Sequence, residues 1–286
     1  MKNISFPPGK ILTLKDGRQV GYAEYGDPGG FPVFGFHGLP GTRLMMKVWD
    51  SIAQAAGARL IAPDRPGYGL SSPHPKGNLA TYPLDIAEMA DAMSLERFSV
   101  AGVSGGGPFA LACAHELPER LMAAAVVSGI GPLSQPGSMR DMIAPNRLML
   151  GLGRISPGIA GQLLTLMIRS SLPSMEKQAQ NGTSPSPDIS PEAFAVIAAD
   201  QKEVVRTGGK GIAFDMKAIW KPWGFRFEDI QTKVYLWHGE ADNLAPASLA
   251  HYIAGCIPGC EATFYPGEGH ADTLIKHGSE VLTKII

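Results

Sequence analysis

The sequence predicts an α/β fold, in which a mostly parallel, eight-stranded twisted sheet carries helices on both faces and an all-helical segment is inserted. Two observations support this prediction. Short apolar runs alternate with segments of helical spacing in the first and last parts of the chain. Between residues 131 and 225 the alternation stops, and apolar helical segments replace the strands. With 44% hydrophobic residues among 286, the chain can bury a sizeable core.

The first part of the chain supplies most of the predicted sheet. An Asp16-Gly17 turn joins two extended runs into a hairpin, and further strands follow; the runs are residues 10–14, 19–25, 31–36, 59–62, 98–103 and 122–127. Segments of helical spacing separate the later strands at 44–56, 79–93 and 108–115. Parallel strands need such crossover helices, so this order predicts a parallel sheet.

The remaining segments divide into a helical insertion and a return to the sheet. Helices are expected at 143–152, 159–170 and 191–206, the last with Ser190 as its N-cap, and a polar loop at 181–188 interrupts them. Strands at 233–237 and 261–265, with helices near 247–254 and 273–286, complete the sheet. We therefore expect residues 1–131 and 226–286 to form one domain around an insertion at 132–225.

Composition and charge exclude several classes of function. The formal net charge is −1 and no basic block occurs, so no nucleic-acid partner is expected. No apolar run approaches the roughly 18 residues of a membrane span, and Pro7-Pro8 interrupts any signal peptide. The cysteines number three and lack zinc-ligand spacing, which indicates reduced thiols and no metal site. These features predict a cytoplasmic protein without a membrane partner and leave its oligomeric state open.

A G-x-S-x-G pattern, Gly102-Val103-Ser104-Gly105-Gly106, ends the predicted strand at 98–103 and precedes a helix. In this setting a sharp strand-to-helix turn lifts the serine hydroxyl above the sheet, and glycine tolerates the crowding on either side. The N-terminus of the helix favours a developing negative charge. Ser104 is therefore the candidate nucleophile, the alternative being a turn residue without chemistry.

A serine hydroxyl needs a base to take its proton and a carboxylate to orient that base. In an open α/β sheet, such groups come from loops at the carboxyl ends of strands. The loop after the strand at 233–237 holds Glu240 and Asp242, which both qualify as the acid, and the loop after 261–265 holds the candidate base His270. The chain order of serine, acid and histidine is the one used by strand-to-helix nucleophile turns of this kind.

The same chemistry needs N–H donors for the oxyanion of the intermediate. The amide of Gly105, directly after the serine, is one candidate. The other is expected in the loop His37-Gly38-Leu39-Pro40-Gly41, which follows the third strand. Pro40 has no N–H to donate, so Leu39 is the second candidate, through its backbone alone.

Taken together, these motifs resemble those of the α/β-hydrolase superfamily. The resemblance covers roughly residues 10–131 and 225–286, and the matching pieces are 37–41, 64–71, 102–106, 238–242 and 267–270, with 223–230 before the seventh strand. In that family's pattern the acid lies two residues past the glutamate position, which favours Asp242. The family's other site for the acid reads Ser128-Gly129-Ile130 here and holds no carboxylate. The resemblance also implies that the insertion is a cap and that the reaction needs no metal or organic cofactor.

Several polar residues have structural interpretations. His37 is expected to hydrogen-bond within the oxyanion loop, and Asp64 and Arg65 are expected to form a polar pair beneath it. His238 is expected to pack beside the sheet. The other histidines lack a partner at a fixed spacing and are interpreted as structural; they are His74, His115, His251 and His277.

The cap is rich in methionine and leucine, which suits either helix packing or an adaptable apolar lining over Ser104. Tryptophans near the end of the cap, where the chain returns to the core, are further candidates for such a lining. The candidate pocket residues are Met142, Met149, Leu163, Met167, Trp220 and Trp223.

The combined interpretation is a serine hydrolase that cleaves carboxylic esters through an acyl-enzyme intermediate, with a small-molecule ester as its partner. An aminopeptidase of the iminopeptidase type shares this core, but it needs cap carboxylates to hold a substrate ammonium group. Those present, which form no evident cluster, are Glu176, Asp188, Glu192, Asp200, Glu203 and Asp215. Lactone or thioester hydrolysis uses the same chemistry, and a ligand receptor on this scaffold can keep the same residues; these remain alternatives.

Overall fold

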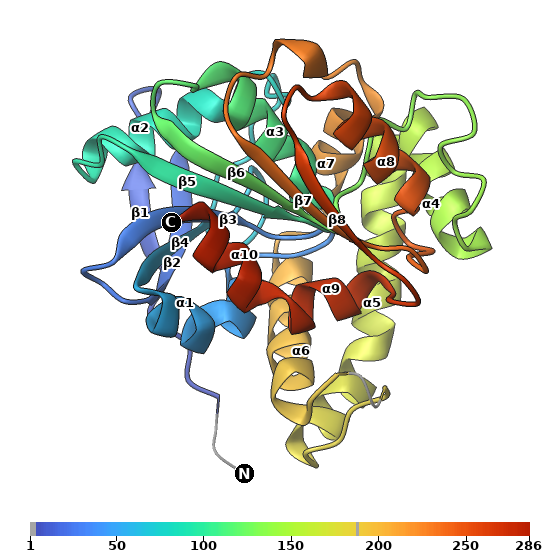
Figure 1. Ribbon diagram of the computed structural model, residues 1–286. Coiled ribbons are helices and arrows are strands. Elements are labelled where there is room, and N and C mark those ends of the chain that lie inside the picture. Colours follow the sequence, from blue (N-terminus) through green and yellow to red (C-terminus); the bar gives the residue numbers. More distant parts are fainter. Residues whose placement is uncertain (1–3, 187–188) are drawn as a thin grey trace.

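The computed structural model describes residues 4–186 and 189–286, and one mixed sheet runs through it (Figure 1). The sheet has eight strands in the order β1-β2-β4-β3-β5-β6-β7-β8. β2 pairs antiparallel with β1 and β4, and the other pairs are parallel. The predicted mostly parallel, eight-stranded sheet is confirmed. The bounds are β1 Lys10–Thr13, β2 Gln19–Gly26, β3 Phe31–Phe36, β4 Ala58–Pro63, β5 Phe98–Val103, β6 Leu121–Val127, β7 Val234–Gly239 and β8 Glu261–Tyr265.

Helices cover both faces of this sheet (Figure 1). On one face, α1 and α10 surround an apolar cluster that includes Trp49 and Leu282. On the other face lie α2, α3 and α8, where Phe109 and Ile253 belong to the larger cluster. Because both faces are shielded from water, every residue of β5 is buried. The helix bounds are α1 Asp50–Ala56, α2 Tyr82–Ala92, α3 Gly107–Glu116, α8 Ala247–Cys256, α9 His270–Lys276 and α10 Gly278–Ile285.

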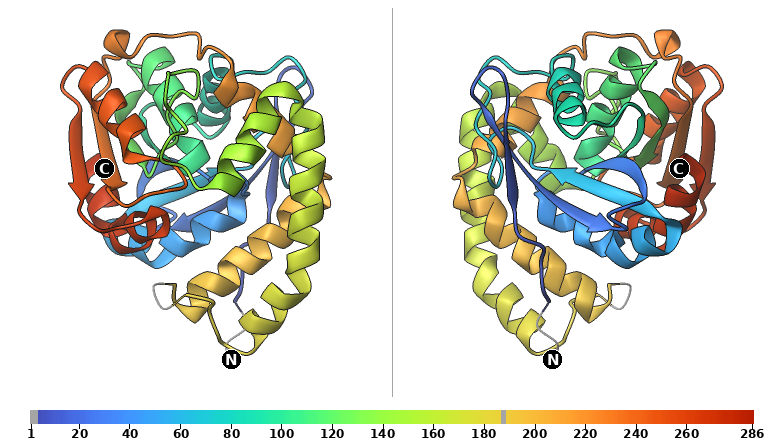
Figure 2. Two further views of the ribbon diagram at one scale, coloured as in Figure 1. Left: turned by 90° about the vertical axis from the view of Figure 1, so that its right-hand side faces the viewer. Right: turned by 90° about the vertical axis from the view of Figure 1, so that its left-hand side faces the viewer.

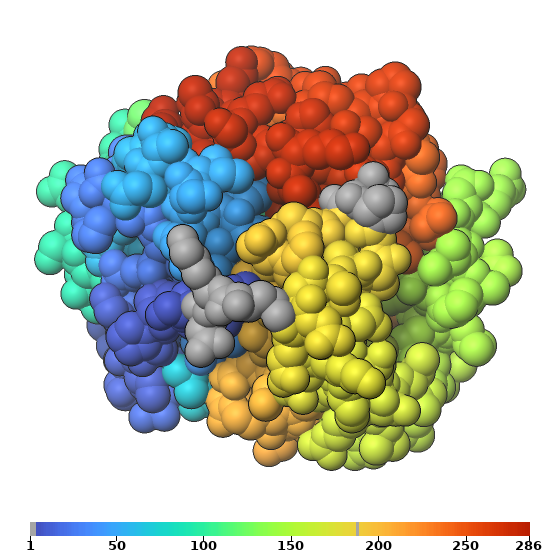
Figure 3. Space-filling model, turned by 90° about the horizontal axis from the view of Figure 1, so that it is seen from below, coloured from blue at the N-terminus to red at the C-terminus, as the bar shows by residue number. Residues whose placement is uncertain are grey.

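The helices between β6 and β7 stand beside the sheet rather than on its faces (Figure 2). They are α4 Ala144–Ile155, α5 Pro157–Gln180, α6 Pro191–Arg206 and α7 Lys210–Trp220. The predicted insertion at 132–225 contains all of them, and we call them the cap. Seen from below, the yellow segment of α5 and α6 borders both the blue N-terminal part and the red C-terminal part of the core (Figure 3).

The cap helices match the predicted segments in place but not always in length. α4 and α5 continue beyond their predicted ends, whereas α6 has its predicted bounds. Ser190 is the N-cap of α6, because its hydroxyl accepts the N–H of Ala193 at 3.1 Å. α7 was not predicted, since it begins after Gly208 and Gly209, whose φ angles are 70° and 83°, and has no side-chain cap. The predicted loop at 181–188 extends into residues 187–188, which lie outside the described residues.

Two predicted helices of the core are each divided. Residues 44–56 form the 3₁₀-helix η1 (Arg43–Trp49) followed by α1. At the junction, the Asp50 carboxylate accepts the N–H of Gly26 at 2.8 Å and contacts Lys47 Nζ at 2.6 Å, which ties this point to β2. The final segment forms α9 and α10 instead of one helix. The candidate base His270 is consequently the first residue of α9 rather than a loop residue.

Candidate active site

Ser104 lies at the sharp turn between β5 and α3. Its φ is 52°, a left-handed conformation that is uncommon for residues other than glycine. A short 3₁₀ turn, η2 (Ser104–Gly106), leads directly into α3. A β-carbon on Gly102 would lie 2.4 Å from the Gly106 carbonyl oxygen, and one on Gly106 would lie 2.3 Å from that of Phe36, so both positions require glycine. This is the geometry that exposes a serine hydroxyl at the end of a strand.

His270 and Asp242 meet at the same end of the sheet. Nδ1 of His270 lies 2.7 Å from Oδ2 of Asp242. The Asp242 side chain has no exposed surface, whereas that of His270 is 21% exposed. Asp242 follows β7 and His270 follows β8, which are adjacent parallel strands, so the topology brings together two residues that are 28 apart in sequence. With Nδ1 on the carboxylate, Nε2 is the ring atom left for a second partner.

The carboxylate of Asp242 is fixed from several sides. Its Oδ1 accepts the N–H groups of Leu244 and Ala245, both at 2.9 Å. Burial raises the pKa of this carboxyl, but hydrogen bonds from His238, His270 and the Ala245 amide outweigh it and hold the pKa well below its usual range. Asp242 is therefore ionised throughout the pH range in which histidine side chains titrate.

Glu240, the competing carboxylate, has another partner. It is exposed and pairs with His251 at 3.0 Å. The structure thus pairs His270 with Asp242, the carboxylate that the family pattern favours.

His238 is buried, as predicted, but it is more than a packing residue. Its Nε2 lies 2.7 Å from the Ala245 carbonyl oxygen and 3.3 Å from Oδ2 of Asp242. Asp242 therefore has a second histidine beside it, which the sequence analysis did not identify. The four-residue spacing between His238 and Asp242 is the signal that could have indicated it.

The loop after β6 connects the serine and histidine sides of the site. The N–H of Ile130 donates to the Ser104 carbonyl oxygen at 3.1 Å. The hydroxyl of Ser128 donates to the His270 carbonyl oxygen, also at 3.1 Å. Within the described ranges, no hydrogen bond joins the Ser104 hydroxyl to the His270 ring. Catalytic hydrogen bonds are often long without substrate and shorten when it binds.

The two candidate oxyanion donors, Leu39 and Gly105, lie side by side. A β-carbon on Gly105 would lie 2.9 Å from the Leu39 amide nitrogen. One on Gly38 would lie 3.5 Å from the β-carbon of Ser104. The oxyanion loop after β3 therefore passes directly over the nucleophile turn, where two backbone N–H groups can face one reacting atom.

His37 ties down this loop, as predicted. Burial, together with the charge of Arg65, holds the pKa of His37 well below its usual range, so the ring is neutral. Its Nε2 accepts the backbone N–H of Arg65 at 3.1 Å, which leaves the proton on Nδ1 to be donated to the Gly38 carbonyl oxygen at 2.9 Å. Each ring nitrogen thus has one role, and neither is available to act as a base.

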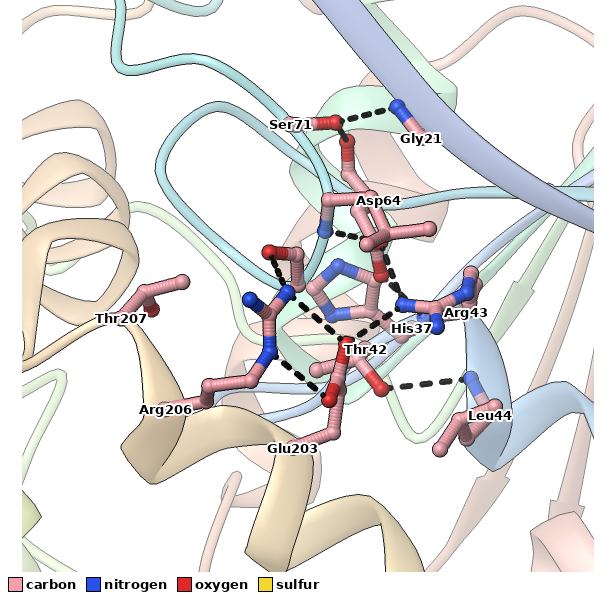
Figure 4. A network of polar contacts seen from close by, with 12 residues as sticks. Gly21, His37, Thr42, Arg43, Leu44, Asp64, Ser71, Glu203, Arg206 and Thr207 are labelled. Carbon is pink, nitrogen blue, oxygen red and sulfur yellow. Dashed lines mark hydrogen bonds and ion pairs between the residues drawn. The ribbon is translucent and has the colours of Figure 1, made fainter. Parts of the chain in front are cut away.

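The predicted pairing of Asp64 with Arg65 is wrong. Asp64 accepts from Arg43, with its Oδ2 2.8 Å from Nη1, while Arg65 pairs with Asp215 of α7 at 2.6 Å. Neighbouring residues of an extended segment point to opposite sides, so the two side chains cannot meet. Arg43 also reaches Glu203 of α6 at 2.9 Å, and Figure 4 shows it between the two carboxylates. Arg65 therefore contacts the cap directly, and Asp64 contacts it through Arg43.

The candidate pocket residues fall into three groups. Met142 and Trp220 belong to an apolar cluster that contacts Leu39, and Met149 packs against a second cluster that also contacts Leu39. Leu163 and Met167, both on α5, are 42% and 52% exposed. Trp223 lies elsewhere: it is buried in the core cluster, with its ring edge-on to Phe227 at 5.5 Å between ring centroids, which is a packing role.

Among the described residues, no group of three or more His, Cys, Asp or Glu side chains is arranged to hold a metal ion. Cys113, Cys256 and Cys260 are all free thiols. In the same part of the chain, no helix is both long enough and apolar enough to cross a membrane.

Comparison with known proteins agrees with this fold. A family model described as "alpha/beta hydrolase fold" matches residues 32–276. Among solved structures, an esterase from Exiguobacterium antarcticum aligns with a TM-score of 0.72 at 18% identity, covering 97% of this chain and 99% of that one. At that identity the likeness shows the fold alone.

Among curated proteins, the chain is 34% identical to a non-heme chloroperoxidase of Streptomyces lividans over 43% of its own length. It is 34% identical to a proline iminopeptidase of Xylella fastidiosa over 38%. The chain spans less than half of these two relatives, 45% and 36% of their lengths. A pimeloyl-[acyl-carrier protein] methyl ester esterase of Nitrosomonas europaea is 25% identical and is matched over 82% of this chain and 88% of the relative.

Proposed function

Because the chain belongs to the α/β-hydrolase fold family, we propose that it is a serine hydrolase that cleaves carboxylic esters. The observation that carries the proposal is the 2.7 Å hydrogen bond between His270 Nδ1 and the buried Asp242 carboxylate, on strand ends next to the Ser104 turn. A carboxylate on Nδ1 fixes the tautomer in which Nε2 accepts a proton. The proposed nucleophile, base and orienting acid thus come from three loops at one end of the sheet.

In the proposed reaction, His270 Nε2 takes the hydroxyl proton as Ser104 Oγ bonds to the ester carbonyl carbon. The carbonyl oxygen becomes an oxyanion, which accepts hydrogen bonds from the Leu39 and Gly105 amides. The bond to the alcohol oxygen then breaks, and the alcohol leaves with the proton from His270. Asp242 stabilises the imidazolium that exists between these steps.

The second half repeats the same path with water. His270 takes a proton from a water molecule whose oxygen attacks the acyl carbon of the Ser104 ester. The acid leaves, and Ser104 Oγ regains its proton from His270.

The cap carboxylates argue against an aminopeptidase. Asp200 accepts from Thr42, and Asp215 is paired with Arg65. Of the other described carboxylates, Glu203 binds Arg43 and Arg206, Glu176 binds Lys202, and Glu192 is exposed in the first turn of α6. Asp188 lies outside the described residues. Carboxylates that already neutralise buried cations are poor ligands for a substrate ammonium group. The relative matched over 82% of this chain, which is named as a methyl ester esterase, points the same way.

A substrate panel tests this proposal. We expect turnover of p-nitrophenyl esters of short to medium chain length and much slower turnover of proline p-nitroanilide. Ser104→Ala should reduce ester turnover by about 10⁴-fold or more. Preferential cleavage of the proline amide would favour the iminopeptidase alternative. Faster cleavage of a lactone or a thioester than of any ester would mean that the natural substrate belongs to that class instead. A single turnover that is not repeated would indicate a ligand receptor.

A further inference from the structure

We infer that Asp215, a residue of the cap, is a positioning residue for the Leu39 oxyanion donor and acts through Arg65. The inference rests on the proposed function, because it assigns a role within the proposed oxyanion site. It goes beyond that function because the orientation of an oxyanion donor then depends on the contact between cap and core.

The first link is a buried bidentate ion pair between core and cap. Asp215 accepts from Arg65 through two bonds, Nε to Oδ1 at 2.9 Å and Nη2 to Oδ2 at 2.6 Å. Neither side chain has any exposed surface. The hydroxyl of Tyr68 donates a further bond to Oδ2 at 3.0 Å. A two-pronged guanidinium–carboxylate pair fixes orientation as well as distance.

The second link runs from Arg65 to the oxyanion loop. Its Nη2 also donates to the Gly38 carbonyl oxygen at 2.9 Å, and its Nη1 donates to that of His37. The guanidinium lies over the Phe109 ring, with Cζ 4.8 Å from the ring centroid. Arg65 is therefore held by the cap on one side and by the core beneath it, and it grips two successive carbonyl groups of the loop.

The third link is the geometry of one peptide group. The Gly38–Leu39 peptide is trans, so its N–H points opposite to its C=O. When Arg65 and His37 hold the Gly38 oxygen, they also fix the direction of the Leu39 N–H. That N–H lies beside Gly105, whose β-carbon, if present, would be 2.9 Å from the Leu39 nitrogen. Preorganised donors of this kind stabilise an oxyanion without reorganising during the reaction.

The chain of contacts spans distant parts of the sequence. Arg65 follows β4, whereas Asp215 is on α7, 150 residues later. α7 lies close to the core here, since a β-carbon on Gly211 would be 2.4 Å from the Tyr68 ring. A cap that is not docked leaves Arg65 without the carboxylate that orients it, so of the two groups that hold the Gly38 carbonyl oxygen only His37 keeps its own support.

The test replaces the ion pair without leaving a buried charge. The double variant Arg65→Met, Asp215→Leu substitutes apolar side chains of similar size, a type of change that is often neutral for stability. We expect cooperative thermal unfolding to be retained and the rate constant of Ser104 phosphonylation by a fluorophosphonate to fall about 10- to 100-fold, less than the 10²–10³ for complete loss of an oxyanion donor. The kcat for a p-nitrophenyl ester should fall by a similar factor, with KM changed about threefold or less, because a mis-aimed oxyanion donor matters chiefly in the transition state.

Glu203→Gln is the matched control. It removes another cap-to-core ion pair, Glu203 with Arg43 at 2.9 Å, which does not touch the Gly38 carbonyl group. We expect its phosphonylation rate to stay within about twofold of the wild type. A folded double variant that reacts at the wild-type rate would overturn the inference, as would an equal loss in the Glu203→Gln variant. A wild-type protein that is not phosphonylated at all would overturn the proposed function itself and the inference with it.

Discussion

The two sides of the proposed site are held by different parts of the molecule. On the acid–base side, Ser104, Asp242 and His270 all follow strands of the core, and backbone amides hold the Asp242 carboxylate. On the oxyanion side, the loop after β3 is held at both ends by carboxylates of the cap: Asp215 acts through Arg65, and Asp200 accepts the N–H and hydroxyl of Thr42 at 2.8 and 2.6 Å.

Variants on the two sides should therefore act differently. Changes on the acid–base side remove a reacting group or its orientation while the sheet stays intact. Changes on the oxyanion side alter buried polar contacts between core and cap, so a single substitution that leaves a buried charge unpaired lowers the stability as well as the rate.

Among variants that keep the nucleophile, the largest effect is expected on the acid–base side, from Asp242→Asn. An amide cannot stabilise the His270 imidazolium and favours the wrong tautomer, so kcat for ester hydrolysis should fall about 10³- to 10⁴-fold. Thermal unfolding should stay cooperative. Glu240→Gln, on the exposed carboxylate paired with His251, is the control and should stay within about twofold of the wild type. Equal losses in the two variants would contradict the assignment of the acid.

On the oxyanion side, Asp215→Asn is expected to destabilise the protein most. It leaves the Arg65 guanidinium buried without its carboxylate, which typically costs about 3–5 kcal/mol. Urea unfolding followed by tryptophan fluorescence measures the loss. The Arg65→Met, Asp215→Leu variant should unfold near the wild-type midpoint, because no charge is left alone. If the single variant proves as stable as the double one, the buried pair does not couple cap to core.

Asp200 gives the smallest expected effect, and it depends on pH. Burial raises the pKa of its carboxyl from 3.8 to about 7, despite the hydrogen bonds from Thr42. Between these values the folded protein holds a proton that the unfolded chain has lost, so this contribution to stability falls as pH rises from about 4 to about 7. The Asn side chain of an Asp200→Asn variant does not titrate, so this pH dependence should disappear. At pH 8 the free energy of unfolding of the variant should exceed that of the wild type by on the order of 2–4 kcal/mol.

Urea unfolding at pH 5 and pH 8 checks this prediction. The control is Glu176→Gln, which alters an exposed pair with Lys202 on the same cap and should keep the wild-type slope. A slope in the Asp200→Asn variant equal to that of the wild type would show that Asp200 is not the group responsible.

The acid–base side could be predicted well from the sequence. Strand ends and turn glycines are local patterns, and the rules of a parallel sheet place Ser104, Asp242 and His270 at one end once the strands are known. The sheet and α6 with its Ser190 cap were predicted on the same local grounds. α7 was missed because its start is a glycine pair, although Ile212, Met216 and Ile219 show helical spacing.

The oxyanion side could not be predicted in the same way. Its partners are Arg65 with Asp215 and Thr42 with Asp200, pairs separated by 150 and 158 residues. No local pattern says which of several cap carboxylates will meet which core cation. The assumption that adjacent charges pair made Asp64 the partner of Arg65, whereas the docked cap supplies a different one. The choice is made by tertiary packing, which the sequence spacing does not encode.

Peptide mapping of the fluorophosphonate-treated protein by mass spectrometry tests whether Ser104, activated by His270, is the nucleophile. We expect a single adduct on the peptide that carries Ser104, formed at least about 10²-fold more slowly in the His270→Ala variant because the serine has lost its base. An adduct on another residue, or labelling of Ser104 at the same rate without His270, would contradict this assignment.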